Sequence, residues 1–366
     1  MRSILLAGGG TTGHISPMLA IGRELRDRLP DVDVFALGTE DGLETTIVPA
    51  ADFELLTIEK VPMPRSLSGG LLRFPQRFAG NISAVRRIIA DRGVTAVVGV
   101  GGYVCPPAYL AAKQAKVPIV IHEANAKPGM ANRLGATLTK PGRVGVTFPG
   151  TKLRNSALVG MPMHSSITGL DRSDEAVRAA ARQALGLAEG KPVLIVTGGS
   201  SGAQRINEAF LSAAAACQAA GVQVLHITGA GKGEALQAAT ADLPDYHVVD
   251  YVDGMDRAYA AADLLVARSG AATVAETTVA GVPAIYVPLP IGNGEQRLNA
   301  SGSLEAGASQ VVDNAAFTEA TVTEVVLPLL ADPAALSRMS RAAADLAYPT
   351  DAAARMAEIT VSALRG

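Results

Sequence analysis

Short apolar runs alternate along the chain with longer stretches in which apolar residues recur at helical spacing. The runs are rich in β-branched residues and end at glycine, proline or polar residues, which is typical of buried strands. Strands that alternate with helices indicate an α/β fold built on a parallel sheet. In the first half of the chain we expect strands at Ile4–Ala7, Val32–Leu37, Ala96–Val100, Pro118–His122 and Gly145–Phe148. Helices are expected at Pro17–Leu29, Ile82–Arg92, Pro107–Ala115 and Gly129–Leu138.

The same alternation restarts in the second half of the chain. Between Gly160 and Asp174 the periodicity lapses and polar residues gather, which indicates a domain boundary. A chain of 366 residues is long enough for two domains. We expect them at residues 1–163 and 164–340, with a helix at about 341–366 packing back onto the first. The second set of strands is predicted at Val193–Thr197, Val222–Thr228, His247–Tyr251, Leu264–Ala267 and Ala284–Pro288, with a helix at Gln204–Ala219.

A glycine-rich loop, GGGTTGH over Gly8–His14, follows the first predicted strand. A helix that begins here presents backbone amides that can bind phosphate. The spacing of Gly8, Gly10 and Gly13 fits a dinucleotide-binding loop, and Glu40 after the next strand leaves an NAD-dependent oxidoreductase open. His14 directly follows the last glycine, in the first turn of the helix, where an imidazole can accept a proton near neutral pH.

The second half repeats this arrangement twice. Gly198–Ala203 follows a predicted strand, and Ser200 adds a hydroxyl donor. Further on, the segment ARSGAATVAE begins at Ala267, and its carboxylate, Glu276, lies about one turn into the helix that follows. A carboxylate there can accept hydrogen bonds from both ribose hydroxyls while loop amides hold a diphosphate. The next strand leads to Gln296 and Asn299, whose amides both donate and accept, as recognition of sugar hydroxyls requires.

Composition narrows the class of protein. The formal net charge is −2, from 32 basic and 34 acidic residues, so no basic field favours nucleic acid. Cys105 and Cys217 lack the spacing of a metal or redox site and indicate a reducing compartment. The chain has neither a signal peptide nor an apolar run of about 20 residues, and we expect a cytosolic protein.

Seven segments together, in the family's order, resemble the MurG glycosyltransferases of peptidoglycan synthesis. They cover nearly the whole chain and are Gly8–Pro17, Gly101–Val104, His122–Asn125, Phe148–Gly150, Gly198–Asn207, Arg268–Glu276 and Glu295–Ala300. The resemblance implies the GT-B fold, two Rossmann-like domains with parallel sheets facing a cleft. It also implies transfer of N-acetylglucosamine from UDP-GlcNAc to the 4-hydroxyl of lipid I with inversion, giving lipid II.

The resemblance also implies roles for individual residues. In the second domain, Glu276 would bind ribose, Val252 would approach uracil, and Gln296 would contact the GlcNAc hydroxyls. The diphosphate would be held by Ser200, Ser269, Gly270 and Ala271. From the first domain, Thr11, Thr12, Gly13 and Asn125 would face the sugar and the acceptor. His14 would be the catalytic base for the acceptor hydroxyl.

The chain departs from the family pattern at three positions. Thr12 stands where much of the family has glycine, His164 where the family usually has arginine, and Glu295 where a glutamine pair is common. Imidazole is a poorer phosphate partner than guanidinium, so His164 is not expected in the site. The sequence shows no metal triad and no Asp-x-Asp pair suited to a metal-held diphosphate. We expect donor binding without a metal and no cofactor beyond the donor substrate.

Lipid I lies in a membrane, so the resemblance places the chain at the cytoplasmic face of the bacterial cell membrane as a peripheral protein. Residues 60–92 carry seven basic side chains and one acidic one, with Leu71, Leu72, Phe74 and Phe78 between them. Such a segment can dip into an anionic leaflet. Other cell-wall enzymes are further candidate partners.

Three other functions stay open on the residues alone. Another UDP-sugar enzyme of the GT-B fold, such as a UDP-GlcNAc 2-epimerase or a natural-product glycosyltransferase, would share the second-domain site. An oxidoreductase would explain the first loop but not the Ser269–Glu276 segment. A nucleotide-sugar-binding protein without activity would leave His14 unexplained.

Overall fold

The computed structural model describes residues 2–62, 69–199, 202–291 and 293–365, and in residues 69–72 it describes the backbone alone. The chain forms two compact units. The N-terminal unit comprises Met1–His164 and Pro349–Gly366, and the C-terminal unit comprises Ser165–Tyr348. The chain therefore passes between the units twice, after His164 and after Tyr348.

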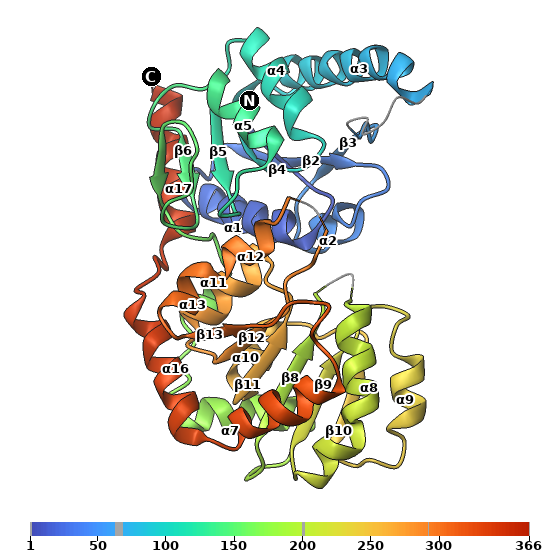
Figure 1. The fold of residues 1–366 in the computed structure, drawn as a ribbon. Helices are drawn as coiled ribbons and strands as arrows, with labels where there is room; N and C mark the ends of the chain where they lie inside the picture. The colour runs from blue at the N-terminus through green and yellow to red at the C-terminus, as the bar shows by residue number, and fades with distance from the viewer. Residues whose placement is uncertain (1, 63–68, 200–201, 292, 366) are drawn as a thin grey trace. The chain divides into compact units, whose positions relative to one another are not determined.

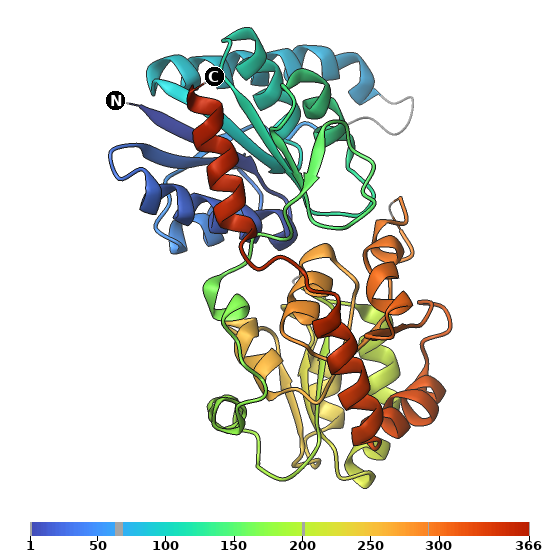
Figure 2. The same ribbon diagram turned by 90° about the vertical axis from the view of Figure 1, so that its left-hand side faces the viewer.

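The N-terminal unit contains a sheet of seven parallel strands in the order β3-β2-β1-β4-β5-β6-β7 (Figures 1 and 2). Its order reverses between β1 and β4, as in doubly wound folds, so ligands are expected at the carboxyl ends of these two strands. The strands are β1 (Ser3–Gly8), β2 (Asp33–Thr39), β3 (Leu55–Ile58), β4 (Val94–Gly101), β5 (Ile119–Glu123), β6 (Val144–Val146) and β7 (Ser156–Leu158).

Helices cover both faces of this sheet. In β1, Ile4 and Leu6 pack against α1 and α17, whereas Leu5 and Ala7 pack on the opposite face against α3 and α4. Successive residues of a strand point to opposite faces, which is why both sets in this strand are apolar. The helices of this unit are α1 (Thr12–Arg28), α2 (Glu44–Ala50), α3 (Gly69–Asp91), α4 (Cys105–Gln114), α5 (Met130–Leu138) and α17 (Ala352–Arg365).

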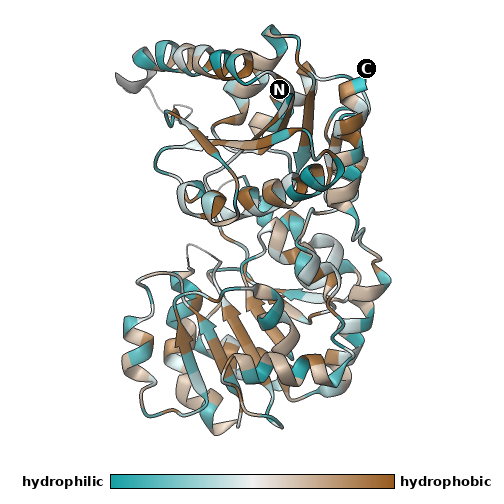
Figure 3. Cartoon of the chain, turned by 180° about the vertical axis from the view of Figure 1, so that it is seen from behind, coloured by the Kyte–Doolittle hydropathy of each residue, from teal (hydrophilic) through white to brown (hydrophobic). Residues whose placement is uncertain are grey.

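The C-terminal unit repeats the design with six parallel strands in the order β10-β9-β8-β11-β12-β13. The order reverses between β8 and β11. The strands carry the strongest apolar character in the hydropathy view (Figure 3). They are β8 (Val193–Thr197), β9 (Gln223–Ile227), β10 (Tyr246–Val249), β11 (Leu264–Ala267), β12 (Ala284–Tyr286) and β13 (Ser309–Val311).

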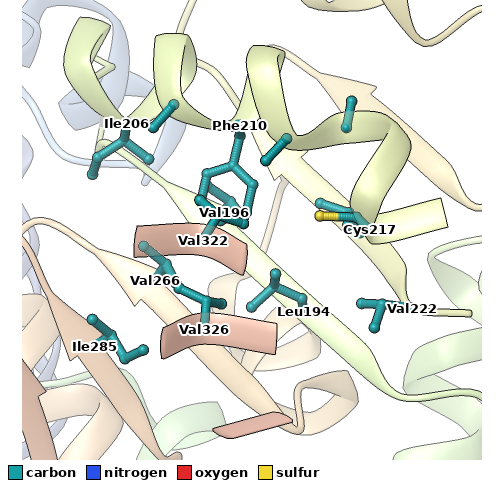
Figure 4. Packing of buried hydrophobic residues seen from close by; sticks show 14 of the residues in the cluster. Leu194, Val196, Ile206, Phe210, Cys217, Val222, Val266, Ile285, Val322 and Val326 are labelled. Carbon is teal, nitrogen blue, oxygen red and sulfur yellow. The ribbon is translucent and has the colours of Figure 1, made fainter. Parts of the chain in front are cut away.

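The core of the C-terminal unit forms where helix α8 lies over this sheet (Figure 4). Phe210 of α8 is fully buried with Leu194 and Val196 of β8, and Val322 and Val326 join the same cluster. The helical segments of this unit are α6 (Ser165–Thr168), α7 (Glu175–Ala184), α8 (Gln204–Ala219), α9 (Glu234–Ala239), α10 (Met255–Ala261), α11 (Ala271–Val279), α12 (Glu295–Asn299), α13 (Ser301–Glu305), α14 (Glu319–Thr321), the π-helical η1 (Val322–Val326), α15 (Leu327–Leu330) and α16 (Pro333–Asp345).

The end of the chain differs from the single helix expected at about 341–366. Helix α16 ends at Asp345 and belongs to the C-terminal unit, while α17 begins at Ala352 and packs on the N-terminal unit. Between them Ala347 adopts a φ of 45°, and Pro349 has no amide hydrogen to continue a helix. The segment that packs back is therefore shorter than expected.

Candidate active site

In the N-terminal unit, two glycine loops meet at the reversal point of the sheet. The first, Gly8–Thr11, joins β1 to α1, and the second, Gly101–Gly102, follows β4. A Cβ on Gly102 would lie 2.7 Å from the carbonyl oxygen of Gly9, closer than real Cβ contacts allow. The loops can approach this closely only because these positions carry no side chain.

His14 lies in the first turn of α1, as predicted, and its ring is half-buried against the second loop. Its Nδ1 is 3.2 Å from the carbonyl oxygen of Gly9, which only accepts hydrogen bonds. Nδ1 therefore carries the proton and donates, which leaves the lone pair on Nε2. A Cβ on Gly101 would lie 2.8 Å from Nε2, so the glycine leaves room for this nitrogen. This tautomer is the one a general base requires.

Burial lowers the pKa of His14 below its ordinary value of 6.5. The carboxylate of Glu123, the carbonyl of Gly9 and the carboxylate of Glu44 raise it in part, but burial has the larger effect. The imidazole is therefore neutral at pH 7 and able to accept a proton.

A buried carboxylate, that of Glu44, forms a hydrogen bond with the first glycine loop. This first residue of α2 accepts hydrogen bonds from the amide of Gly10 at 2.9 Å and from the amide and hydroxyl of Thr39 at 2.8 Å. Burial by itself would raise the pKa of Glu44, but these hydrogen bonds lower it below its ordinary value. The Gly10 amide is thus already bonded to an internal anion, which disfavours a dinucleotide phosphate there. Glu40, the acidic residue considered for a dinucleotide site, is exposed.

Replacing Glu44 with glutamine is expected to lower the free energy of unfolding by about 2 kcal/mol. The NH₂ group of the glutamine would face the backbone amide of Gly10 or Thr39, and that buried amide would lose its acceptor. The measurement is urea unfolding of the whole chain. The control is Glu54→Gln, which removes a half-exposed ion pair with Arg92 in the same unit and should cost less than about 1 kcal/mol. Equal losses in the two variants would show that Glu44 does not hold the loop.

The loop after β5 is organised by a second buried carboxylate, Glu123. It accepts hydrogen bonds from the amides of Asn125 and Gly129 and from the side chain of Asn132. Asn132 in turn accepts from the hydroxyl of Tyr109 at 2.7 Å. Asn125, expected to face the acceptor, is therefore held in a fixed loop of the unit that contains His14.

In the C-terminal unit, the corresponding loop follows β11 and leads into α11. Gly270 is the N-cap of this helix and has no side chain to occupy the amides of the first turn. Ser269 is fully buried, and no partner for its hydroxyl lies among the residues that the structure describes. A helix start that follows such a loop is suited to bind an anion. Ser269, Gly270 and Ala271 thus lie together, as expected.

Glu276 lies in the second turn of α11 and is half-buried. Its Oε2 accepts a hydrogen bond from the hydroxyl of Tyr259 at 2.8 Å. Burial raises the pKa of Glu276 to about 7, although the hydrogen bond from Tyr259 opposes this. Its carboxyl group therefore titrates close to neutral pH in the free protein.

Three side chains hold the loops around this helix start. Arg268 donates to the carbonyl of Val287 and to Asn314, and Asn299 donates to the carbonyl of Ser269. Gln296 accepts from the amide of Leu289 at 2.9 Å. The amide oxygen of Gln296 is thus engaged within the protein, and its NH₂ group is the part that can reach a sugar hydroxyl. Asn299, considered from the sequence for sugar contacts, is buried beneath the loop instead.

The remaining predicted residues occupy different settings. Val252 is buried in the loop after β10, and Thr11, Thr12 and Gly13 form the N-cap and first helical residues of α1. Ser200 lies outside the described residues. His164 is exposed at the end of the N-terminal unit. The Glu295 carboxylate accepts from the amide of Asn293, which closes the turn before α12.

The described residues contain no group of three or more His, Cys, Asp or Glu side chains placed to hold a metal ion. The sequence can also be compared with known protein families, which identifies the class of protein more specifically than the positions of these side chains do. Residues 4–140 match the glycosyltransferase family 28 N-terminal domain, and residues 193–356 match the glycosyltransferase family 28 C-terminal domain.

Individual relatives match over the full chain. A protein of Clavibacter sepedonicus is 50% identical over 365 residues, covering 100% of this chain and 97% of its own. It is named UDP-N-acetylglucosamine–N-acetylmuramyl-(pentapeptide) pyrophosphoryl-undecaprenol N-acetylglucosamine transferase. The crystal structure of Acinetobacter baumannii MurG is similar with a TM-score of 0.77 and 26% identity, covering 99% of both chains.

A UDP-GlcNAc 2-epimerase from Neisseria meningitidis, bound to UDP-GlcNAc, matches with a TM-score of 0.70 and 14% identity, covering 99% of this chain and 100% of its own. At that identity the likeness concerns the fold alone. Together with the two parallel sheets, these neighbours show that the chain has the GT-B fold, as the sequence predicted.

Proposed function

Because this chain belongs to glycosyltransferase family 28 and, within it, to the MurG enzymes, we propose that it transfers N-acetylglucosamine from UDP-GlcNAc to lipid I, forming lipid II. The observation that carries this function is the 50% identity to a transferase of that name along the full chain. The acceptor in that name is the undecaprenyl-linked N-acetylmuramyl pentapeptide.

The donor site proposed in the C-terminal unit follows the geometry of α11. The amides of Gly270 and Ala271 at its start hold the diphosphate electrostatically, with the hydroxyl of Ser269 beside them. The Glu276 carboxylate accepts hydrogen bonds from the ribose hydroxyls, and the loop at Val252 approaches uracil. Gln296 donates to a hydroxyl of the sugar. Ser200 keeps its expected diphosphate contact as part of the proposal.

The N-terminal unit supplies the acceptor side in this proposal. Nε2 of His14 removes the proton from the 4-hydroxyl of the acceptor while that oxygen attacks the anomeric carbon of the donor. The bond from that carbon to the diphosphate breaks, and UDP leaves with the electron pair. A single in-line displacement inverts the α-linked donor to a β-1,4 product. Asn125 and the Thr11–Gly13 segment orient the sugars.

Donor binding is proposed to require no metal ion and no further cofactor. The support is chemical, because the first turn of α11 offers amides and a helix dipole where the leaving group needs positive potential.

Membrane association is proposed to use the first half of α3. Val85 and Ile89, in its second half, belong to the core, whereas Arg73 and Arg77 are exposed. Phe74 and Phe78 are half-buried and stack on each other with ring centroids 5.4 Å apart. The side chains of Leu71 and Leu72 and all of Arg65 lie outside the description.

In the folded protein, acidic residues neutralise part of the positive charge of residues 60–92. Arg77 pairs with Glu59, and Arg92 pairs with Asp33 and Glu54. Within the described ranges Arg73, Arg86 and Arg87 have no ion pair, so they remain available to anionic lipid. Taken singly, none of the described helices is long and apolar enough to cross a membrane, and one sharply bent pair of helices passes that test only when joined.

Replacing Phe74 and Phe78 together with serine is expected to reduce co-sedimentation with vesicles that contain phosphatidylglycerol, while UDP affinity is unchanged. Apolar rings flanked by arginines contribute both burial and attraction to such a surface. Leu158→Ser is the control, because this leucine is 43% exposed on a different element of the same unit. Vesicle binding equal to that of the parent would contradict the proposed surface.

The proposed transferase activity and the alternative, a UDP-GlcNAc 2-epimerase activity, differ in whether the reaction requires an acceptor. With UDP-GlcNAc alone, the protein should bind the donor without converting it, and UDP should appear only when lipid I is added. Appearance of a 2-epimer or of stoichiometric UDP without acceptor would favour the epimerase activity instead. The measurement is anion-exchange separation of the nucleotide products.

A further inference from the structure

A buried tyrosine contacts the carboxylate that the donor site depends on. Tyr259 belongs to α10 and is 1% exposed. Its hydroxyl is 2.8 Å from Oε2 of Glu276 on α11, and Glu276 is the more accessible of the two residues. Two helices thus meet through one hydrogen bond at the group proposed to bind ribose.

The direction of this hydrogen bond is settled by chemistry. Burial and the neighbouring carboxylate raise the pKa of Tyr259 well above its ordinary value of 10, so the hydroxyl keeps its proton and donates. Each carboxylate oxygen can accept more than one hydrogen bond, so Oε2 remains able to accept another, and among the residues that the structure describes none donates to Oε1. The tyrosine therefore restrains the carboxylate without blocking it.

We propose that Tyr259 is a positioning residue that fixes the Glu276 carboxylate toward the ribose hydroxyls and thereby sets the preference for ribonucleotide over deoxyribonucleotide. This inference rests on the proposed function of the C-terminal unit. A restrained carboxylate rejects a ligand that lacks the hydroxyls, because it then stays desolvated and unpaired. A carboxylate free to rotate can turn toward water and tolerates the missing hydroxyls.

The protein contains a matched control for this tyrosine. Tyr286 of β12 is also 1% exposed, and its hydroxyl lies 2.5 Å from Oγ1 of Thr277, the residue after Glu276 on the same helix. Tyr286→Phe removes a buried tyrosine hydroxyl that bonds to α11 but not to the carboxylate. A general effect of loosening α11 would appear equally in both variants.

The experiment measures the dissociation constants of UDP and of 2′,3′-dideoxy-UDP at pH 8 for the parent, Tyr259→Phe and Tyr286→Phe. Tyr259→Phe should weaken UDP binding by roughly tenfold, as expected if the unrestrained carboxylate loses one of its hydrogen bonds with ribose. Binding of the dideoxy analogue should change much less, so the preference for UDP shrinks. Tyr286→Phe should keep the parent's preference. Partial unfolding lowers both affinities equally and does not imitate this result.

A variant cycle provides the second measurement. In a Glu276→Ala background, Tyr259→Phe should not weaken UDP binding further, because the group it positions is gone. A preference in Tyr259→Phe equal to that of the parent, or full additivity in the cycle, would overturn the proposed role of Tyr259. A parent protein that does not distinguish the two nucleotides would instead refute the ribose contact of Glu276 itself.

Discussion

Replacing His14 with alanine is expected to lower the turnover number by a factor of roughly 10²–10⁴, the usual contribution of a general base. The reason lies in its tautomer. Nδ1 donates to the carbonyl of Gly9, and Nε2 lies where Gly101 leaves space. Donor affinity in this variant should stay within about twofold of the parent, because the nucleotide site is proposed in the C-terminal unit. The measurement is single-turnover transfer at saturating UDP-GlcNAc beside calorimetric titration of UDP.

The pH dependence of the same reaction gives an independent check on His14. Its pKa is lowered from 6.5 by burial, so the base is deprotonated at neutral pH and becomes protonated only below 6.5. With the donor saturating, the transfer rate should therefore fall as the pH decreases below 6.5. The residual activity of His14→Ala should not show this decrease. A rate for His14→Ala within roughly tenfold of the parent would show that His14 is not the sole base.

Replacing Glu276 with alanine is expected to weaken binding of UDP-GlcNAc by roughly 10- to 100-fold, because the proposed hydrogen bonds from ribose to the carboxylate would be lost. Turnover at saturating donor should change far less than the Michaelis constant, since ribose is remote from the reacting carbon. Glu305→Ala, which removes an exposed carboxylate from the same unit, is the control and should leave affinity unchanged. Equal affinity of Glu276→Ala and the parent would contradict the donor site.

The affinity for UDP-GlcNAc should also depend on pH through Glu276. Its pKa is raised to about 7 in the free protein, and ribose hydroxyls favour the charged form. Affinity should therefore fall as the pH decreases through about 7, by roughly tenfold between pH 8 and pH 6. The diphosphate diester of UDP-GlcNAc does not titrate in this range, so the change reports the protein. Glu276→Gln should remove the dependence.

The sequence predicted the central strands well because burial on both faces leaves a continuous apolar run. The strand at Val193–Thr197 and the strand at Leu264–Ala267 have the predicted bounds. The strand β3 and the helix α2 were not predicted, because an edge strand and a short helix carry little periodicity. Helix α1 begins at Thr12, five residues before the expected Pro17, and Pro17 lies inside the helix, where its missing amide hydrogen removes one helical hydrogen bond without ending the helix.

The parts of the site that depend on distant residues could not be read from the sequence. Glu44 is buried because Gly9, Gly38 and Gly42 lack the side chains that would occupy its place. Tyr259 and Glu276 are separated by 17 residues and a strand, and only the packing of α10 near α11 joins them. Glu44 stood in the sequence as an ordinary charged residue at a helix start, whereas Glu276 was predicted as the ribose ligand and only its hydrogen bond to Tyr259 was missed.

The most direct test of the proposed function is incubation of the protein with UDP-GlcNAc and authentic lipid I, followed by quantification of UDP and of the lipid products by mass spectrometry. We predict one UDP released for each lipid that gains one N-acetylhexosamine, with both products absent when either substrate is omitted. Absence of the extended lipid, in a preparation that still binds UDP-GlcNAc, would contradict the proposed transfer.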